Sequence, residues 1–377
     1  MADPRRLLAE FEKLVSFDAE SFHEAAIKEY LKEKLSSLGL TVSEDDAAEK
    51  LGSGPDGAGN LLGRLKGKED GVPLLFCAHM DTVAPGRGKR AVVREDGTVT
   101  SDGTTVLGAD DAAGIAAILE ALTVIREENL THPDLEILFS VAEEPYCRGT
   151  SVFDYTLLRS GTAYVLDLTG GIGTAAVRAP SILSLEITVT GKAAHAGFVP
   201  EDGINALSIA ASALAALPTG HVSEDTTVNF GVISGGAGKN IVPAEVRIFG
   251  EIRSLRHEAA LEEADKIRSV FGREARAFGG TADVTVTEEI RAYSIGAHEY
   301  VVRRFDAALA SLCYGESTLV TTYGGSDNNN LAAHGIRGIV MANAMFDVHS
   351  TGEYTDIGSL TRCAELTLRL MTMEDTP

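Results

Sequence analysis

Short, continuous apolar runs recur in the first half of the chain, and each of them leads into His, Asp or Glu. The runs cover residues 74–78, 135–141 and 163–166. Runs of this length without polar alternation are typical of strands that are buried on both faces. A helical pattern over residues 111–125 separates the first two runs. Because strands and helices alternate, we predict an α/β fold with a mostly parallel, helix-covered sheet.

The pattern changes near residue 181, which indicates a second domain. Strands are predicted at 184–190, 226–233, 246–253 and 282–288, with helices at 203–217 and 257–271. The order β-α-β-β-α-β is that of an α+β ferredoxin-like unit. The first pattern then resumes, with helices at 299–312, at 328–333 and from 357, and strands at 319–322 and 338–342. We therefore predict a first domain of residues 1–178 and 290–377, interrupted by an inserted domain of residues 179–289.

The charge of the chain argues against two classes of partner. The sequence has 55 acidic and 33 basic residues, for a formal net charge of -22. Nucleic acids and anionic membrane surfaces would be repelled, so neither is expected as a partner. The first residues lack the apolar core of a signal peptide, and the four cysteines show no paired spacing. Reduced thiols and a cytoplasmic location are the expectation.

A histidine and several carboxylates stand where the predicted strands end. His79 and Asp81 follow the first run, Glu143 and Glu144 follow the second, and Asp167 follows the third. In open α/β sheets, ligands bind beyond the carboxyl ends of the strands. His and carboxylate oxygens gathered at such an edge predict a metal site that serves hydrolysis.

The roles of these residues follow from their spacing. Adjacent side chains in an extended chain point in different directions, so we assign Glu144 as a metal ligand and Glu143 as the general base. We assign the carboxylate of Asp81 to hold the second ring nitrogen of His79. Each residue also has an ordinary alternative: His79 as a lone loop histidine, and Asp167 as a turn residue before a Gly-Gly pair.

Asp110 and Asp111 precede the predicted helix at residues 111–125. Either carboxylate could simply cap that helix, because free N–H groups at a helix start accept such a partner. The functional interpretation is that Asp110 bridges two metal ions about 3.5–4 Å apart while Asp111 caps or supports. Cys147 lies close to Glu144 in sequence and is either a soft metal ligand or a bystander thiol.

Further candidates come from later in the chain. His349 lies in a polar loop and is predicted to be the last metal ligand. His195, in the inserted domain, is predicted to close over the substrate and stabilise an oxyanion, although an ordinary loop histidine is the alternative. Asn240 and Arg253 are polar candidates for substrate binding from the same domain.

The loop GGSDNNN precedes a short predicted helix. Its backbone N–H groups at Gly325 and Ser326 could receive a carboxylate of the substrate. The alternative is a Gly-Gly turn in which Ser326 or Asp327 caps the helix.

The motifs of the chain resemble those of a known family. In chain order they are CAHMDTV, LGADDAAG, SVAEEP, VLD, GKAAHAG, GGAGKNIVPAEV, GEIRS, GGSDNNN and DVHSTGE. The chain resembles the di-zinc metallopeptidases and amidohydrolases that include peptidase T, glutamate carboxypeptidase and aminoacylase, and it is most similar to the peptidase T-like branch. The resemblance covers nearly the whole chain. It departs from the family pattern at Ala112, Ala142, Leu168 and the turn at residues 145–148.

The resemblance implies a ligand set for two zinc ions, for which cobalt or manganese could substitute. One zinc would be held by His79, Asp110 and Asp167, and the other by Asp110, Glu144 and His349. Glu143 would activate the bridging water, and the peptide bond between Asp110 and Asp111 would be cis. The inserted domain would serve as a lid and as a surface for homodimer formation, which could bring His195 to the partner's site.

The function implied by the resemblance is metal-dependent hydrolysis of small peptides, by an aminopeptidase or tripeptidase. An N-acyl-amino-acid amidohydrolase or a carboxypeptidase would use the same metals and differ only in its substrate pocket. A metal-binding protein without catalysis is the alternative from another class.

Overall fold

The protein is described from a computed structural model that covers residues 1–68 and 71–374, and these residues divide into two compact units. The first unit consists of Met1–Arg178, Ser294–Thr322 and the segment from Ser326 onward. The second consists of Ala179–Tyr293 and Tyr323–Gly325. None of the helices in the described part of the chain is long and apolar enough to cross a membrane.

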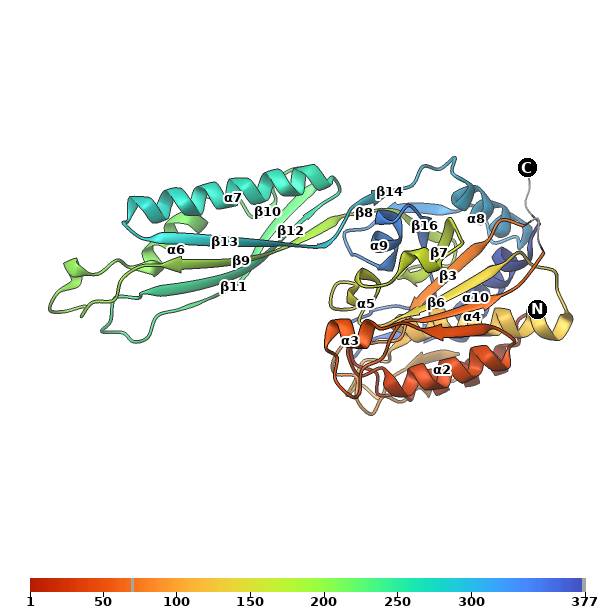
Figure 1. The fold of residues 1–377 in the computed structure, drawn as a ribbon. Coiled ribbons are helices and arrows are strands. Elements are labelled where there is room, and N and C mark those ends of the chain that lie inside the picture. The colour runs from red at the N-terminus through yellow and green to blue at the C-terminus, as the bar shows by residue number, and fades with distance from the viewer. Residues whose placement is uncertain (69–70, 375–377) are drawn as a thin grey trace. The chain divides into compact units, whose positions relative to one another are not determined.

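The first unit is built on a nine-stranded sheet (Figure 1). Its strands, in spatial order, are β1 (Thr41–Glu44), β2 (Leu61–Leu65), β6 (Leu135–Ser140), β3 (Leu74–His79), β7 (Thr162–Leu168), β16 (Arg337–Ala342), β8 (Thr174–Ala179) and β14 (Tyr293–Ser294), with β15 (Thr318–Thr321) beside β8. The four central strands β6, β3, β7 and β16 are parallel, as predicted. The flanks are partly antiparallel, at β1–β2, β2–β6 and β16–β8.

Both faces of this sheet are covered. Phe76 and Tyr164 stack with ring centroids 5.4 Å apart, and the Tyr164 hydroxyl donates to the carbonyl of Val301 in α8. Cys77 points to the opposite face, where its thiol lies 3.8 Å from the carboxylate of Asp327 in α9. The helices of this unit are α1 (Pro4–Val15), α2 (Ala25–Ser37), α3 (Ala47–Leu51), α4 (Ala109–Glu128), α5 (Arg148–Ser151), α8 (Tyr300–Ser311), α9 (Asp327–Ala333) and α10 (Ile357–Thr372). A small sheet of β4 (Val92–Val93), β5 (Thr98–Thr100) and β17 (Tyr354–Asp356) completes it.

The second unit has the predicted ferredoxin-like order. Its strands are β9 (Ser181–Thr190), β10 (Gly220–His221), β11 (Thr226–Gly235), β12 (Glu245–Ser254) and β13 (Thr281–Ile290), and its helices are α6 (Ala206–Ala215) and α7 (His257–Ala277). The sheet runs β13-β9-β12-β11 with antiparallel neighbours, which is the arrangement of a split βαβ unit. Buried Ile187, Ile248 and Phe271 lie in its core, between the sheet and the two helices.

The parallel strands determine where the functional residues lie. His79 is the last residue of β3, Glu143 comes three residues after the end of β6, and Asp167 is the penultimate residue of β7. His349 lies in the loop that follows β16. Because the carboxyl ends of neighbouring parallel strands meet at one edge of a sheet, these residues converge there.

Candidate metal centre

Asp110 lies between two imidazole rings. Its Oδ1 is 2.9 Å from Nε2 of His79, and its Oδ2 is 3.2 Å from Nε2 of His349. Burial alone would raise the pKa of Asp110, but hydrogen bonds with His349 and His79 lower it. Each oxygen of this carboxylate therefore serves a different ring, which is the arrangement needed to bridge two cations.

Two carboxylates complete the cluster. Oε2 of Glu144 is 3.0 Å from Nε2 of His349, and Oδ1 of Asp167 is 3.9 Å from Nε2 of His79. Potential ligand atoms of His79, Asp110 and Glu144 all lie within 4.8 Å of one another. The same holds for His79, Glu143 and Asp167. The structure therefore brings together all five residues that we predicted as ligands.

The chemistry of this donor set fits divalent metal ions. Two imidazoles and several carboxylates suit zinc, cobalt and manganese. Oε1 of Glu144 is buried and has no hydrogen-bond partner among the described residues. Hydrogen bonds with Asp110 and Glu144 raise the pKa of His349 to about 10. Without a metal ion, His349 therefore carries a proton, which metal binding to this ring would release. A bound cation would then interact with the carboxylates of Asp110 and Glu144 in place of that proton.

Asp81 supports the site differently from our prediction. Nδ1 of His79 lies 2.9 Å from the backbone carbonyl oxygen of Asp81, whereas Oδ1 of the carboxylate is 3.5 Å away. A proton on Nδ1 that is donated to this carbonyl leaves Nε2 free to bind a metal. The Asp81 carboxylate instead accepts the N–H groups of Glu143 and Glu144, at 2.9 and 3.2 Å. The Ser21 hydroxyl also donates to it.

Glu24 is a functional candidate that the sequence analysis missed. Its side chain is buried, and Oε1 accepts the N–H of Ala142 at 3.0 Å. The Asp81 carboxylate accepts the N–H groups of the next two residues, Glu143 and Glu144. The carboxylates of Glu24 and Asp81 together therefore bind three consecutive backbone N–H groups. Glu24 lies at the start of a helical pattern with no local sign of burial, so only the fold reveals this contact.

Replacing Glu24 by glutamine tests how the buried carboxylate affects stability. Burial and the nearby charge of Asp81 raise the pKa of Glu24 from 4.5 to about 7. The folded protein holds this proton more tightly than the unfolded chain. Protonation of Glu24 therefore stabilises the folded protein fully at a pH below the pKa in the unfolded chain. This stabilisation is lost as the pH rises through the pKa in the folded protein. We expect the stability of Glu24→Gln relative to the parent to rise by about 2 kcal/mol from about pH 5 to pH 8, measured by urea denaturation. Identical pH dependence of the two proteins would contradict this expectation.

The loop that carries Asp110 is held from both sides. Its peptide bond to Asp111 is cis, as the resemblance implied. The Asp111 carboxylate accepts the N–H groups of His79 and Gly114, both at 3.1 Å, and the side-chain amide of Asn343 at 2.7 Å. Asp111 therefore supports the His79 strand as well as the start of α4.

Glu353 holds the other side of the same loop. Its buried carboxylate accepts the N–H groups of Gly108 at 2.7 Å and of Asp110 at 2.9 Å. No role was predicted for Glu353 or Asn343, although Glu353 belongs to the motif DVHSTGE that also contains His349.

The GGSDNNN loop makes structural contacts around the site. The buried Asp327 carboxylate accepts the hydroxyls of Ser140 and of Thr150. The backbone N–H of Ser326 donates to Oδ1 of Asn329 at 3.1 Å. A Cβ at Gly325 would lie 2.1 Å from Cδ1 of Ile290, so a larger residue would require the end of that side chain to move. These contacts explain much of the motif without a ligand, and binding of a substrate carboxylate to Gly325 and Ser326 stays a prediction.

The remaining predicted residues belong to the second unit. Nδ1 of His195 accepts the N–H groups of Gly197 and Phe198, both at 3.1 Å, so a neutral ring carries its proton on Nε2. The carbonyl of Asn240 accepts the N–H of Ala196 at 3.0 Å, which places these two loops side by side. The Arg253 guanidinium is engaged by the Glu251 carboxylate and by the carbonyl of Tyr323.

Cys147 is not arranged as a metal ligand. Its thiol is buried and lies 3.2 Å from Oε1 of Glu143. Burial raises the pKa of this thiol well above its usual range, and the negative charges of Glu143 and Asp327 raise it further. The group therefore keeps its proton and donates it in a hydrogen bond.

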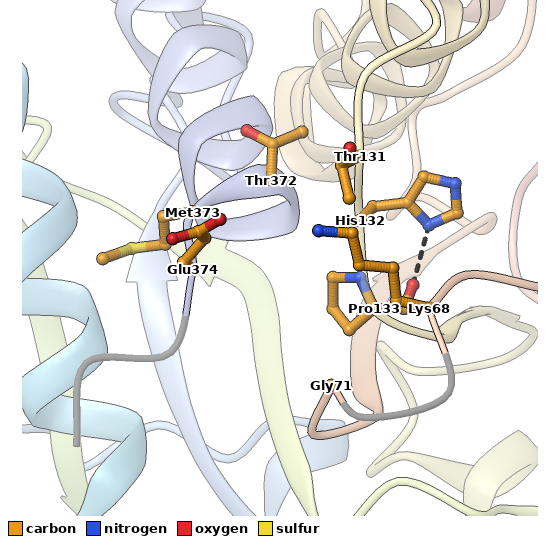
Figure 2. A pocket seen from close by; sticks show the side chains of 8 residues that line it. All are labelled: Lys68, Gly71, Thr131, His132, Pro133, Thr372, Met373 and Glu374. Atoms are coloured by element: carbon orange, nitrogen blue, oxygen red, sulfur yellow. Dashed lines mark hydrogen bonds between the residues drawn. The ribbon is translucent and has the colours of Figure 1, made fainter.

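A cavity of about 280 Å³ lies away from the cluster, beside the beginnings of β3 and β6 (Figure 2). Its lining includes Lys68, His132 and Glu374. Nδ1 of His132 lies 2.7 Å from the carbonyl of Pro133, as the dashed line in Figure 2 shows. His132 and Pro133 come just before β6, at the amino end of a parallel strand, so the cavity is separate from the metal cluster at the carboxyl ends.

The fold and the cluster together define a metallopeptidase, a hydrolase that uses metal ions to cleave peptide bonds. Residues 60–179 match the family described as Peptidase family M28, and residues 178–278 match the Peptidase dimerisation domain. The chain belongs to the metallopeptidase family that includes peptidase T, within its peptidase T-like branch. Membership of this family implies that the protein binds divalent metal.

Several relatives match over almost the whole chain, and three of them are at least 35% identical to it. YqjE of Bacillus subtilis is 39% identical over 371 residues, which are 98% of this chain and 99% of that protein. The crystal structure of aminopeptidase PepT from Bacillus cereus is 37% identical, with a TM-score of 0.91 and 98% of each chain covered. The crystal structure of a tripeptidase from Staphylococcus aureus is 35% identical, with a TM-score of 0.94 and 99% and 98% covered.

Proposed function

We propose that the protein is a two-zinc aminopeptidase that removes the N-terminal residue of small peptides, above all tripeptides. The observation that carries the proposal is the Asp110 carboxylate, whose two oxygens face His79 and His349 separately. Asp167 would complete the ligands of the zinc at His79, and Glu144 those of the zinc at His349. The names of two similar structures, an aminopeptidase and a tripeptidase, support this choice of substrate.

Glu143 acts as the general base in this proposal. When bound, the metal ions polarise the substrate carbonyl and make a water molecule more acidic. Burial raises the pKa of Glu143 well above its usual range, and the nearby charges of Asp327, Glu144 and Asp81 raise it further. A carboxylate of this kind is suited to accept a proton from the attacking water and to pass it to the leaving amine. Asp81 positions Glu143 through the backbone N–H that it accepts.

The second unit supplies the remaining groups in the proposal. Residues 1–178 and 290–377 would form the catalytic domain, and residues 179–289 a lid that also forms the homodimer interface. The tautomer of His195 presents Nε2–H, which is the donor needed to stabilise an oxyanion. Asn240, Arg253, Gly325 and Ser326 are proposed to contact the substrate. We place the protein in the cytoplasm, which fits its four free cysteines.

A panel of small substrates tests the proposed specificity. The purified protein, supplied with zinc, cobalt or manganese, is given an unblocked tripeptide, the same peptide N-acetylated, and an N-acetylated single amino acid. Release of the N-terminal residue, followed by chromatography, is expected from the unblocked tripeptide alone. Cleavage of the acetylated amino acid would instead identify an N-acyl-amino-acid amidohydrolase, and loss of the C-terminal residue would identify a carboxypeptidase. Metal binding without cleavage of any peptide would indicate a catalytically silent protein.

A further inference from the structure

Cys147 closes a tight turn that begins at Glu143. The N–H of Cys147 donates to the carbonyl of Glu143 at 2.5 Å, and the N–H of Arg148 donates to the carbonyl of Ala142 at 2.8 Å. The Cys147 side chain then folds back, so that Sγ lies 3.2 Å from Oε1 of the Glu143 carboxylate. Cys147 is 1% exposed, so its thiol meets this carboxylate with little competition from water.

The backbone at Cys147 is in a conformation that favours glycine. Its φ is 54°, in the left-handed region where a Cβ causes steric strain and where glycine carries no such penalty. A cysteine at this position therefore disfavours the turn locally. The contact between its thiol and Glu143 is an interaction that glycine could not make.

The carbonyl of Cys147 is also held in place. Nδ2 of Asn330 donates to it at 3.1 Å, and the Thr150 hydroxyl lies 3.2 Å from it. Asp327 in turn accepts the Thr150 hydroxyl. With both its N–H and its carbonyl engaged, Cys147 cannot move away from Glu143 without breaking several hydrogen bonds.

We propose that Cys147 is a positioning residue for the general base: its S–H donates to Oε1 of Glu143 and fixes the orientation of that carboxylate. The other carboxylate oxygen is then left to accept the proton of the attacking water. The inference rests on the role of Glu143 under the proposed function. A base whose orientation is fixed before substrate binds loses less entropy on reaching the transition state.

Three variants test this role: Cys147→Ala removes the donor, Cys147→Ser retains a donor, and Cys363→Ala removes a different buried thiol, in α10. For Cys147→Ala we expect kcat for the tripeptide to fall about tenfold, the effect of one lost hydrogen bond, while KM and bound zinc stay at parental values. Cys147→Ser should recover at least about half of the lost activity, since its hydroxyl can donate. Cys363→Ala should lose stability but retain the parental kcat.

Thermal melts and elemental analysis of every variant separate positioning from folding. A parental kcat in Cys147→Ala, or equally low kcat in the alanine and serine variants, would overturn the inference. Glu143→Gln is measured alongside. If the parent cleaves the tripeptide, Glu143→Gln does not, and Cys147→Ala equals the parent, the positioning role alone is wrong. If Glu143→Gln is fully active, the proposed role of Glu143 fails, and the inference fails with it.

Discussion

Replacement of Glu143 by glutamine is expected to lower kcat for a tripeptide by about 10²–10⁴-fold, the usual contribution of a general base. Glutamine matches glutamate in size but cannot accept the proton of the attacking water. The backbone N–H of residue 143 would still donate to Asp81, so the turn should remain intact. Bound metal and melting temperature should therefore stay close to parental values. Steady-state kinetics, elemental analysis and a thermal melt on one preparation provide the measurement.

The control is Glu29→Gln, since Glu29 is an exposed acid on α2. The Glu29→Gln variant should retain the parental kcat and KM. This result would show that loss of a carboxylate far from the metal centre does not affect catalysis. Retention of more than about a tenth of the parental kcat by Glu143→Gln would remove this residue from the role of base.

Replacement of Asp110 by asparagine is expected to abolish turnover and to reduce tightly bound metal from two ions to at most one per chain. The two oxygens of this carboxylate face His79 and His349, and an amide offers one oxygen and no negative charge. In the parent, metal at about 100 times its dissociation constant should stabilise the fold by about 2.7 kcal/mol per site. The variant should lose much of this stabilisation, which melts with and without added zinc would measure.

Asp56→Asn is the matched control for this prediction, because Asp56 is exposed. It should bind two metal ions and show the parental rise in melting temperature. If Asp110→Asn also bound two ions tightly, the carboxylate would not be the bridge between them.

The centre of the sheet could be predicted because burial leaves a pattern along the chain. The strands β3, β6 and β7 are short apolar runs that end in polar ligand types, and parallel pairing then brings His79, Glu144 and Asp167 to one edge. Some of the short edge strands could not be predicted in the same way. β1 and β14 are four and two residues long and contain no apolar run, and β1 pairs antiparallel with β2.

The supporting residues escaped prediction for a different reason. Glu24 and Glu353 are ordinary acids in their local sequence, yet they accept backbone N–H groups 118 and 243 residues away, at Ala142 and Asp110. Nothing in a local pattern encodes such a partner. Asp81 illustrates the same limit. Its proximity to His79 was predicted correctly, but the atoms in contact differ. The backbone carbonyl of Asp81 contacts the His79 ring, and its carboxylate accepts the N–H of Glu143 in the turn after β6.

The Glu353 carboxylate accepts the N–H groups of Gly108 and Asp110, which lie 245 and 243 residues earlier in the sequence. During synthesis, the N-terminal part of a protein folds before the C-terminal part is available. The loop that presents Asp110 therefore lacks one of its anchors until Glu353 has been synthesised. A hydrolase assembled in this order can complete its catalytic centre only after both of these segments have been synthesised.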